Sequence, residues 1–357
     1  MQRTVEPLLY PCGDAPEPGM GHEVAPGVFW LRMPLPLSLD HINLWAIRDG
    51  DDWALFDSGM DTPATQDAWR QLLAPGGALE GGRAARLFVT HMHPDHIGLA
   101  GWLNQAFGSE LWMTQTEYLN CRMLAADTGR SAPEEGVRFY QAAGWDASAI
   151  ARYQERFGGF GKMISPLPQA YRRLRDGDIV RIGEHDWQVW VGTGHSPEHA
   201  CFYSPDLHLL IAGDQVLPRI SPNVSVFPTE PLADPLGEWL QSLARFRQML
   251  PDDVLVLPAH GEPFRGLHAR LDRLLEGHAK GLQRLQARLA EGPRRAIDVF
   301  GALFARPIGA DLLSLATGEC LANLNYLVQR GRVAVEVDGE GVCWYHATQP
   351  TSLPPLC

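Results

Sequence analysis

Short apolar runs that end at turn-forming residues recur along the first 260 positions, and this pattern predicts strands alternating with helices. Runs at 27–33 and 41–48 predict two strands, and an acidic turn at 49–52 leads from the second of them into a third at 53–56. Further strands are predicted at 86–89, 111–113, 178–182, 187–191, 207–211 and 254–257, and helices at 63–73, 97–107, 115–126 and 236–250. We therefore expect an α/β fold.

Two later stretches depart from this pattern. Aromatic residues at helical spacing in 133–162 predict a helical insertion, at about 133–165. After Phe264 the chain predicts a long amphipathic helix at 271–289, short helices near 296–304 and 311–315, an apolar stretch at 320–329, and a hairpin of 333–337 with 342–345. Three helices closed by a hairpin are typical of a winged helix. We therefore expect two domains, 1–263 and 264–357.

Composition limits the class of protein. The net charge of the 357 residues is −12, which disfavours non-specific binding to nucleic acid, although 264–332 carries 11 Lys and Arg against 6 Asp and Glu. The six cysteines are scattered without CxxC spacing, which argues against a disulfide framework and against a cysteine-based zinc site. The N-terminus lacks a signal-peptide pattern, and no run has the roughly 20 apolar residues of a membrane span. We expect a cytoplasmic protein that does not bind membranes.

Polar residues recur where predicted strands end. Five such strand ends carry Asp57, His91, His195, Asp214 and His260. Loops at one edge of a helix-covered sheet come together there and commonly bind ligands. The sequence therefore predicts one site built from segments far apart in the chain.

The densest cluster is His91, His93, Asp95 and His96, which lie within six positions directly after an apolar run. Imidazole and carboxylate groups are the ligands expected for Zn²⁺ and similar cations. His91 and His93 are two residues apart and face the same side in extended backbone, whereas Asp95 and His96 follow at the turn into a helix and can reach a second ion. His195, Asp214 and His260 can complete the two sites.

The segments THMHPDH, GTGHSPEH, AGDQ and PAHGE occur in this order, each after a predicted strand. Over about 24–262 the chain resembles the metallo-β-lactamase superfamily, and in particular the hydroxyacylglutathione hydrolase-like and β-lactamase-like-2 groups, the latter with an appended winged helix. The resemblance implies an αβ/βα four-layer sandwich and a binuclear metal centre. It implies His91, His93 and His195 on one ion, Asp95, His96 and His260 on the other, Asp214 between them, and Asp57 supporting the ligands.

Two cations roughly 3.5–4 Å apart can hold a hydroxide that attacks a carbonyl. We expect Asp95 to orient this nucleophile, Asp214 to offset the charge of both ions, and His199 to act as a supporting or proton-transfer group. Zinc is the expected metal, and iron and manganese fit the same ligands.

Three functions are consistent with the sequence, and hydrolysis of a small ester or thioester ranks first. The aromatic insertion and the apolar loop at 220–227 could wall an acyl pocket. A ribonuclease or phosphodiesterase that uses the winged helix to bind nucleic acid ranks second, with Arg330 and Arg332 where the last helix meets the hairpin. A mononuclear iron persulfide dioxygenase, in which His96 and His260 hold no metal, is the third.

A binding protein with a vestigial site is disfavoured, because all seven ligands are present. Glu198 stands where many thioesterase-like relatives have Gly, and no Tyr closely follows Asp214, which weakens a lactonase interpretation. A homodimer is a further expectation.

Overall fold

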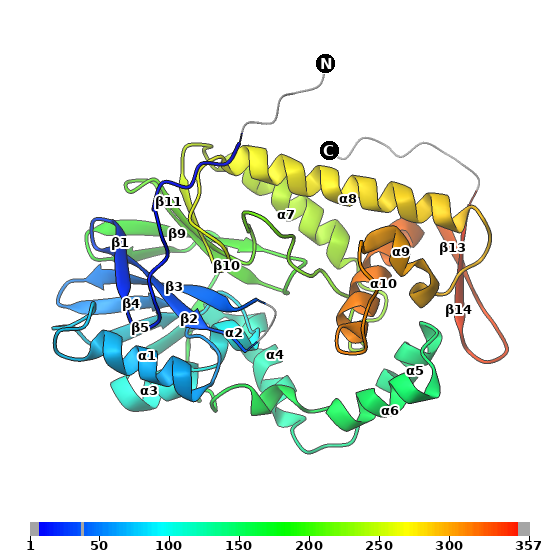
Figure 1. Ribbon diagram of the computed structural model, residues 1–357, viewed down its shortest axis with the longest axis horizontal. Helices are drawn as coiled ribbons and strands as arrows, with labels where there is room; N and C mark the ends of the chain where they lie inside the picture. The colour runs from blue at the N-terminus through cyan, green and yellow to red at the C-terminus, as the bar shows by residue number, and fades with distance from the viewer. Residues whose placement is uncertain (1–6, 37–38, 349–357) are drawn as a thin grey trace.

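The computed structural model describes residues 7–36 and 39–348. Its first sheet contains seven strands in sequential order, of which Figure 1 labels β1 to β5. The first four pair antiparallel and the last four pair parallel. The strands are β1 (Gly21–Ala25), β2 (Val28–Pro34), β3 (His41–Asp49), β4 (Asp52–Phe56), β5 (Ala84–Phe88), β6 (Glu110–Thr114) and β7 (Arg172–Leu174).

The second sheet contains five strands, in the order β12-β11-β10-β9-β8. Only β11 and β12 pair parallel, and the other neighbours are antiparallel. The strands are β8 (Ile179–Ile182), β9 (His185–Gly192), β10 (His199–Ser204), β11 (Leu209–Gly213) and β12 (Leu255–Pro258). A separate hairpin pairs β13 (Val333–Val337) with β14 (Cys343–Ala347).

Helices connect these strands. The sequence explains several of their starts: Thr62 caps α1 by accepting the N–H of Thr65, and Asp234 caps α7 by accepting that of Gly237. The helices are α1 (Pro63–Leu73), α2 (Pro94–Ile97), α3 (Ala100–Phe107), α4 (Gln115–Ala126), α5 (Glu134–Ala142), α6 (Ala147–Arg156), α7 (Pro235–Met249), α8 (Leu267–Leu289), α9 (Phe300–Leu303) and α10 (Leu313–Gln329), with 3₁₀ turns η1 (Phe160–Lys162) and η2 (Ala296–Val299).

Three apolar cores hold the layers together. The core between the sheets includes Phe56 from the first sheet and Phe202 from the second, with ring centroids 4.9 Å apart. A second core lies between the first sheet and helices α1, α3 and α4, and a third joins the second sheet to α7, α8 and α10. The order helix, sheet, sheet, helix confirms the predicted four-layer αβ/βα sandwich.

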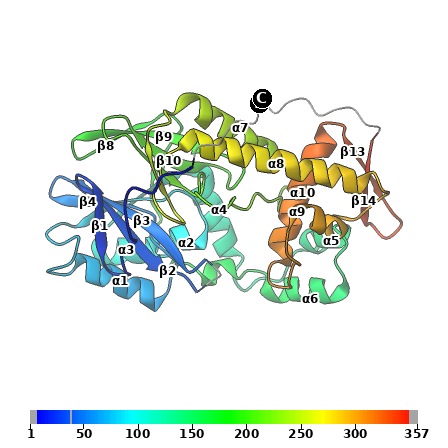
Figure 2. The same cartoon turned by 45° about the horizontal axis from the view of Figure 1, so that its top comes forward.

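The insertion and the C-terminal segment pack together at one end of the molecule (Figures 1 and 2). Trp145, between α5 and α6, donates a hydrogen bond from Nε1 to Thr317 Oγ1 on α10 at 2.9 Å. Arg156 pairs with Asp311 at 2.8 Å. Since the third core runs from the second sheet to β14, the C-terminal helices share their apolar interior with the sandwich. The boundary at 263/264 and the winged-helix assignment stay predictions.

Several predicted elements differ from the structure. The strands β1, β7 and β10 were missed, and β10 gives no alternating pattern because five of its six residues are buried. The helix expected at 97–107 begins only at Ala100, as α3, since the N–H of Leu99 bonds to Gly59 O and Ser58 Oγ; Ile97 instead ends the short helix α2. The short helix expected near 311–315 and the apolar stretch at 320–329 belong to one helix, α10, which includes Gly318.

No helix among residues 7–36 and 39–348 is both long and apolar enough to span a membrane.

Candidate metal centre

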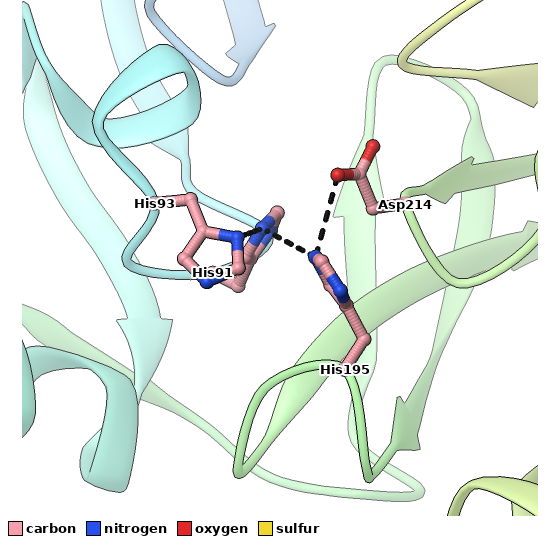
Figure 3. A group of neighbouring side chains, drawn as sticks. All are labelled: His91, His93, His195 and Asp214. Atoms are coloured by element: carbon pink, nitrogen blue, oxygen red, sulfur yellow. Dashed lines mark hydrogen bonds and ion pairs between the residues drawn. The ribbon is translucent and has the colours of Figure 1, made fainter. Parts of the chain in front are cut away.

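The first ligand set comes from both sheets (Figure 3). His91 and His93 follow β5, and His91 Nε2 lies 2.8 Å from His93 Nδ1. His195 follows β9 and places its Nε2 3.2 Å from His91 Nε2. Asp214 directly follows β11 and completes the group, with Oδ2 3.3 Å from His195 Nε2. Four ligand-type side chains distant in sequence thus converge at the edge where the two sheets meet.

The second set contains Asp95, His96 and His260, whose ligand atoms lie within 4.8 Å of one another. Asp95 and His96 are on the short helix α2, and His260 follows β12. Asp95 Oδ2 is 3.4 Å from His260 Nε2 and 3.8 Å from His96 Nε2. The structure therefore brings together all seven side chains that the sequence singled out as ligands.

Asp214 faces both sets. Its Oδ2 lies 3.5 Å from His96 Nε2 as well as near His195, and its Oδ1 lies 3.5 Å from His260 Nε2. A single carboxylate within reach of both groups can bridge two cations.

Backbone carbonyls fix the orientation of two of the candidate ligands. His195 Nδ1 donates to Asn223 O at 2.7 Å, and His260 Nδ1 donates to His41 O at 2.9 Å. Because a carbonyl only accepts, Nδ1 of each ring carries a proton, and Nε2 faces the centre.

Asp57 lies behind the second ligand set, in contact with His96 and Thr90. Its Oδ2 lies 2.7 Å from His96 Nδ1 and also accepts from Thr90 Oγ1, while its Oδ1 accepts from the N–H of Thr90 at 2.7 Å. Asp57 adopts φ +61°, a conformation that costs energy in residues other than glycine. These contacts orient His96 so that its Nε2 points to the second set.

Electrostatics differ between the two sets. Burial and neighbouring histidines lower the pKa of His91 well below its ordinary value and that of His93 to about 3, so both rings are neutral at pH 7. Burial also disfavours a charged His96, but the carboxylates of Asp57, Asp95 and Asp214 outweigh it and raise the pKa of His96. The centre thus combines neutral imidazoles with a concentration of carboxylates that attracts cations.

His199 lies behind the first set, and its ring stacks on His91 with centroids 4.7 Å apart. Its Nε2 accepts the N–H of Asp214 at 3.1 Å, and its Nδ1 is 3.5 Å from Cys201 Sγ. These contacts favour a supporting place for His199, and its predicted part in proton transfer stays a prediction.

Glu117, a fully buried carboxylate on α4, was not among the residues predicted from the sequence. Its Oε2 accepts the N–H of Met92, between two ligands, at 2.9 Å, and its Oε1 accepts the N–H of Glu198 at 2.8 Å. Glu117 therefore ties together the loops that carry His91, His93 and His195. A lone Glu at the start of a helix normally indicates only a favourable charge near its N-terminus.

The donor set fits metal ions. His96 Nε2 and Asp214 Oδ1 are buried without a hydrogen-bond partner, which is costly unless another group satisfies them. Imidazole nitrogens and carboxylate oxygens at this spacing suit zinc, iron or manganese.

The chain belongs to the metallo-β-lactamase superfamily, whose model matches residues 37–261, and residues 282–348 match the model of a metallo-β-lactamase-like C-terminal domain. As expected for this superfamily, it is a metal-dependent hydrolase. A β-lactamase domain protein from Burkholderia ambifaria has the same fold, with 40% identity, a TM-score of 0.87, and 96% of this chain and 98% of that chain covered.

Relatives with described activities are more distant. A probable metallo-hydrolase of Bacillus subtilis is 23% identical over 84% of this chain and 92% of its own length. An acyl-coenzyme A thioesterase of Gallus gallus is 25% identical over 67% of this chain and 79% of its own length. A hydroxyacylglutathione hydrolase of Haemophilus influenzae is 25% identical over 49% of this chain and 68% of its own length. The predicted resemblance to hydroxyacylglutathione hydrolases is thereby confirmed.

Proposed function

We propose that this protein is a binuclear hydrolase that cleaves a small acyl thioester or ester. The observation that carries the proposal is the position of Asp214, which reaches ligands of both sets with its two oxygens. Two bound divalent ions, with zinc as the expected metal, would supply a Lewis acid for the carbonyl oxygen and lower the pKa of water.

The protein's own side chains would orient the reactants. Asp95 is the more exposed of the two carboxylates at the centre, with 20% of its side chain accessible against 10% for Asp214. Asp95 can therefore accept a hydrogen bond from an attacking water while His260 fixes its other contact. The more buried Asp214 would balance positive charge between the two sets.

An acyl thioester is supported by the relatives and by the apolar surface near His195. Thioester hydrolysis is the named activity of two of the relatives above. The loop that carries Asn223 also carries exposed Ile220 and Phe227, and Asn223 Nδ2 lies 3.4 Å from the backbone oxygen of Leu315, whose side chain is exposed. In the insertion, Phe139 and Trp145 pack against the third core, so we place the acyl group elsewhere. The acyl group would therefore contact the loop at 220–227 and the start of α10.

Nucleic acid is a weaker proposal for the substrate. Basic side chains of the C-terminal segment have partners within the chain: Arg330 pairs with Asp234 and Arg295 with Asp298. The tip of the hairpin adds exposed Asp338 and Glu340, which repel phosphate.

Iron dioxygenase chemistry is also a weaker proposal. It would leave His96 and His260 without metal, yet their Nε2 atoms point toward the carboxylates of Asp95 and Asp214. A cytoplasmic location and a homodimer stay predictions.

The test is a substrate panel assayed with metal-loaded protein: acyl-coenzyme A and acylglutathione thioesters, carboxylic esters, lactones, a phosphodiester and single-stranded RNA. We expect thioester or ester cleavage, measured as thiol or acid release, and its loss in His260→Ala. Cleavage of the phosphodiester or RNA alone would overturn the proposal, as would oxygen consumption without hydrolysis.

A further inference from the structure

We propose that Asn223 and Glu319 are positioning residues through which helix α10 sets the orientation of His195. The inference rests on the metal centre of the proposed function and gives the C-terminal segment a part in it. It does not depend on which substrate is cleaved.

The connection starts at the ligand itself. His195 Nδ1 donates to the carbonyl of Asn223 at 2.7 Å, and this bond turns Nε2 toward Asp214 and His91. The bond therefore decides both the tautomer and the direction of the ligand. A shift of the Asn223 carbonyl would move Nε2 away from the other ligands of the first set.

The side chain of Asn223 holds that carbonyl in place. Its Nδ2 donates to Glu319 Oε2 at 2.9 Å and lies 3.4 Å from Leu315 O, both on α10. Its Oδ1 accepts from Ser225 Oγ. Both polar atoms of the amide are thus engaged, and the shorter of the two Nδ2 contacts is with the carboxyl of Glu319 on α10.

The surrounding loop depends on the same helices. Residues 215–227 form no helix or strand, so their position must come from contacts with neighbouring elements. Arg270 of α8 donates to Leu217 O, and to Ile220 O at 2.7 Å. The N–H of Val226 donates to Gly318 O on α10 at 3.0 Å.

Gly318 shows how closely helix and loop approach. A Cβ at this position would lie 2.7 Å from Ser225 Oγ and 2.9 Å from Val226 O, so only glycine fits. The backbone of α10 therefore lies directly against the loop that carries Asn223. Glu319, the next residue, is placed by this contact.

A purely structural role for these contacts and a role in orienting His195 lead to different experimental outcomes. If these contacts only stabilise the fold, a change at Glu319 alters the stability of the metal-free protein and leaves metal affinity as it was. If they orient His195, the affinity of the first ligand set falls more than that of the second.

The experiment compares Glu319→Ala with Glu319→Gln in the full-length protein. Glutamine keeps an oxygen that can accept from Asn223 Nδ2, whereas alanine leaves that donor without a partner. Loss of such a supporting contact typically weakens metal affinity 10–100-fold, so we expect about a 10-fold loss for alanine and near-normal affinity for glutamine. Glu276→Ala on α8, which removes an exposed pair with Lys280, is the control.

Affinity for each of two Zn²⁺ ions is measured by chelator competition, and the visible spectrum of Co²⁺-loaded protein reports the ligand geometry. Selective weakening of one ion in Glu319→Ala, with a changed spectrum and rescue by glutamine, supports the inference. Unchanged affinities, equal weakening of both ions, or equal effects of alanine and glutamine would overturn it. Normal metal binding by the wild type without thioester cleavage would instead contradict only the proposed function.

Discussion

Replacing Glu117 by Gln tests whether this buried carboxylate joins the loop that carries His91 and His93 to the loop that carries His195. In the wild type, Glu117 accepts one N–H from each loop, at Met92 and at Glu198. The amide of glutamine has one oxygen and one NH2 group, so it can accept from only one of these donors. The other N–H would face a second donor and lose its partner.

The size of the effect follows from these two contacts. A hydrogen bond to a charged group contributes about 1.5–3 kcal/mol, and a buried donor left without a partner costs about 1–3 kcal/mol. Burial raises the pKa of Glu117, so the neutral amide avoids part of the cost of burying a charge, which offsets some of the loss. We expect the free energy of unfolding to fall by about 2 kcal/mol.

The assay is urea unfolding of metal-free protein, followed by zinc affinity of the folded protein. Glu117→Gln should unfold at lower urea and bind zinc at least about 10-fold more weakly, since His195 and the His91–His93 pair lose their common support. Glu135→Gln, in the exposed first turn of α5, should match the wild type. Wild-type stability and zinc affinity in Glu117→Gln would refute the assigned role.

Three further predictions follow from named contacts. His93→Ala should lose metal, measured by elemental analysis, and its rate of hydrolysis should fall at least about 100-fold. Turnover by this variant that persists after chelation would contradict the assignment of His93 as a ligand. Burial raises the pKa of Glu319 to about 7 from 4.5, so the folded state holds this proton more tightly and stability falls as the pH rises through that window. Glu319→Gln has no proton to lose, so the free energy of unfolding of its metal-free form should rise by about 1 kcal/mol relative to that of the wild type between pH 4.5 and 8; solvent screening of the partly exposed group keeps the effect small. A difference in unfolding free energy that does not change with pH would contradict this. Gly318→Ala should lower the free energy of unfolding by about 1–3 kcal/mol, because the added Cβ meets Ser225 and Val226. Gly277→Ala on α8, where a Cβ has open space, is the control and should not lower it. Equal unfolding curves for the two variants would argue against the close approach of α10 to the loop.

The candidate ligands were predictable because each of them follows an apolar strand in a short polar motif. The pairing of His91 with His93 and the position of Asp214 after β11 could be read from strand ends alone. The alternation of strands and helices predicted an α/β fold, and the four-layer order was implied by the resemblance.

The supporting residues were not predictable, because their contacts join segments far apart in sequence. Glu117 lies 81 positions from Glu198, and Asn223 lies 96 positions from Glu319, and neither belongs to a local motif. The continuity of α10 was missed for a related reason. Gly318 weakens helix propensity locally, and the tertiary contact that requires a glycine there is invisible in a single sequence.

The shared third core also limits what can be learned by truncation. Leu271 and Leu324, from the C-terminal segment, pack in the same core as Trp239 of α7 and Val256 of β12. Removing 264–357 would expose this core, so single substitutions such as those at Glu319 are the sharper test of what the segment does.

The central claim, a binuclear centre with Asp214 between the ions, is tested most directly by anomalous scattering from crystals of the zinc-loaded protein. We expect two peaks roughly 3.5–4 Å apart, one among His91, His93 and His195 and the other among Asp95, His96 and His260, each within coordination distance of Asp214. A single peak in the first set, with His96 and His260 bound only to Asp95 and Asp214, would contradict the account.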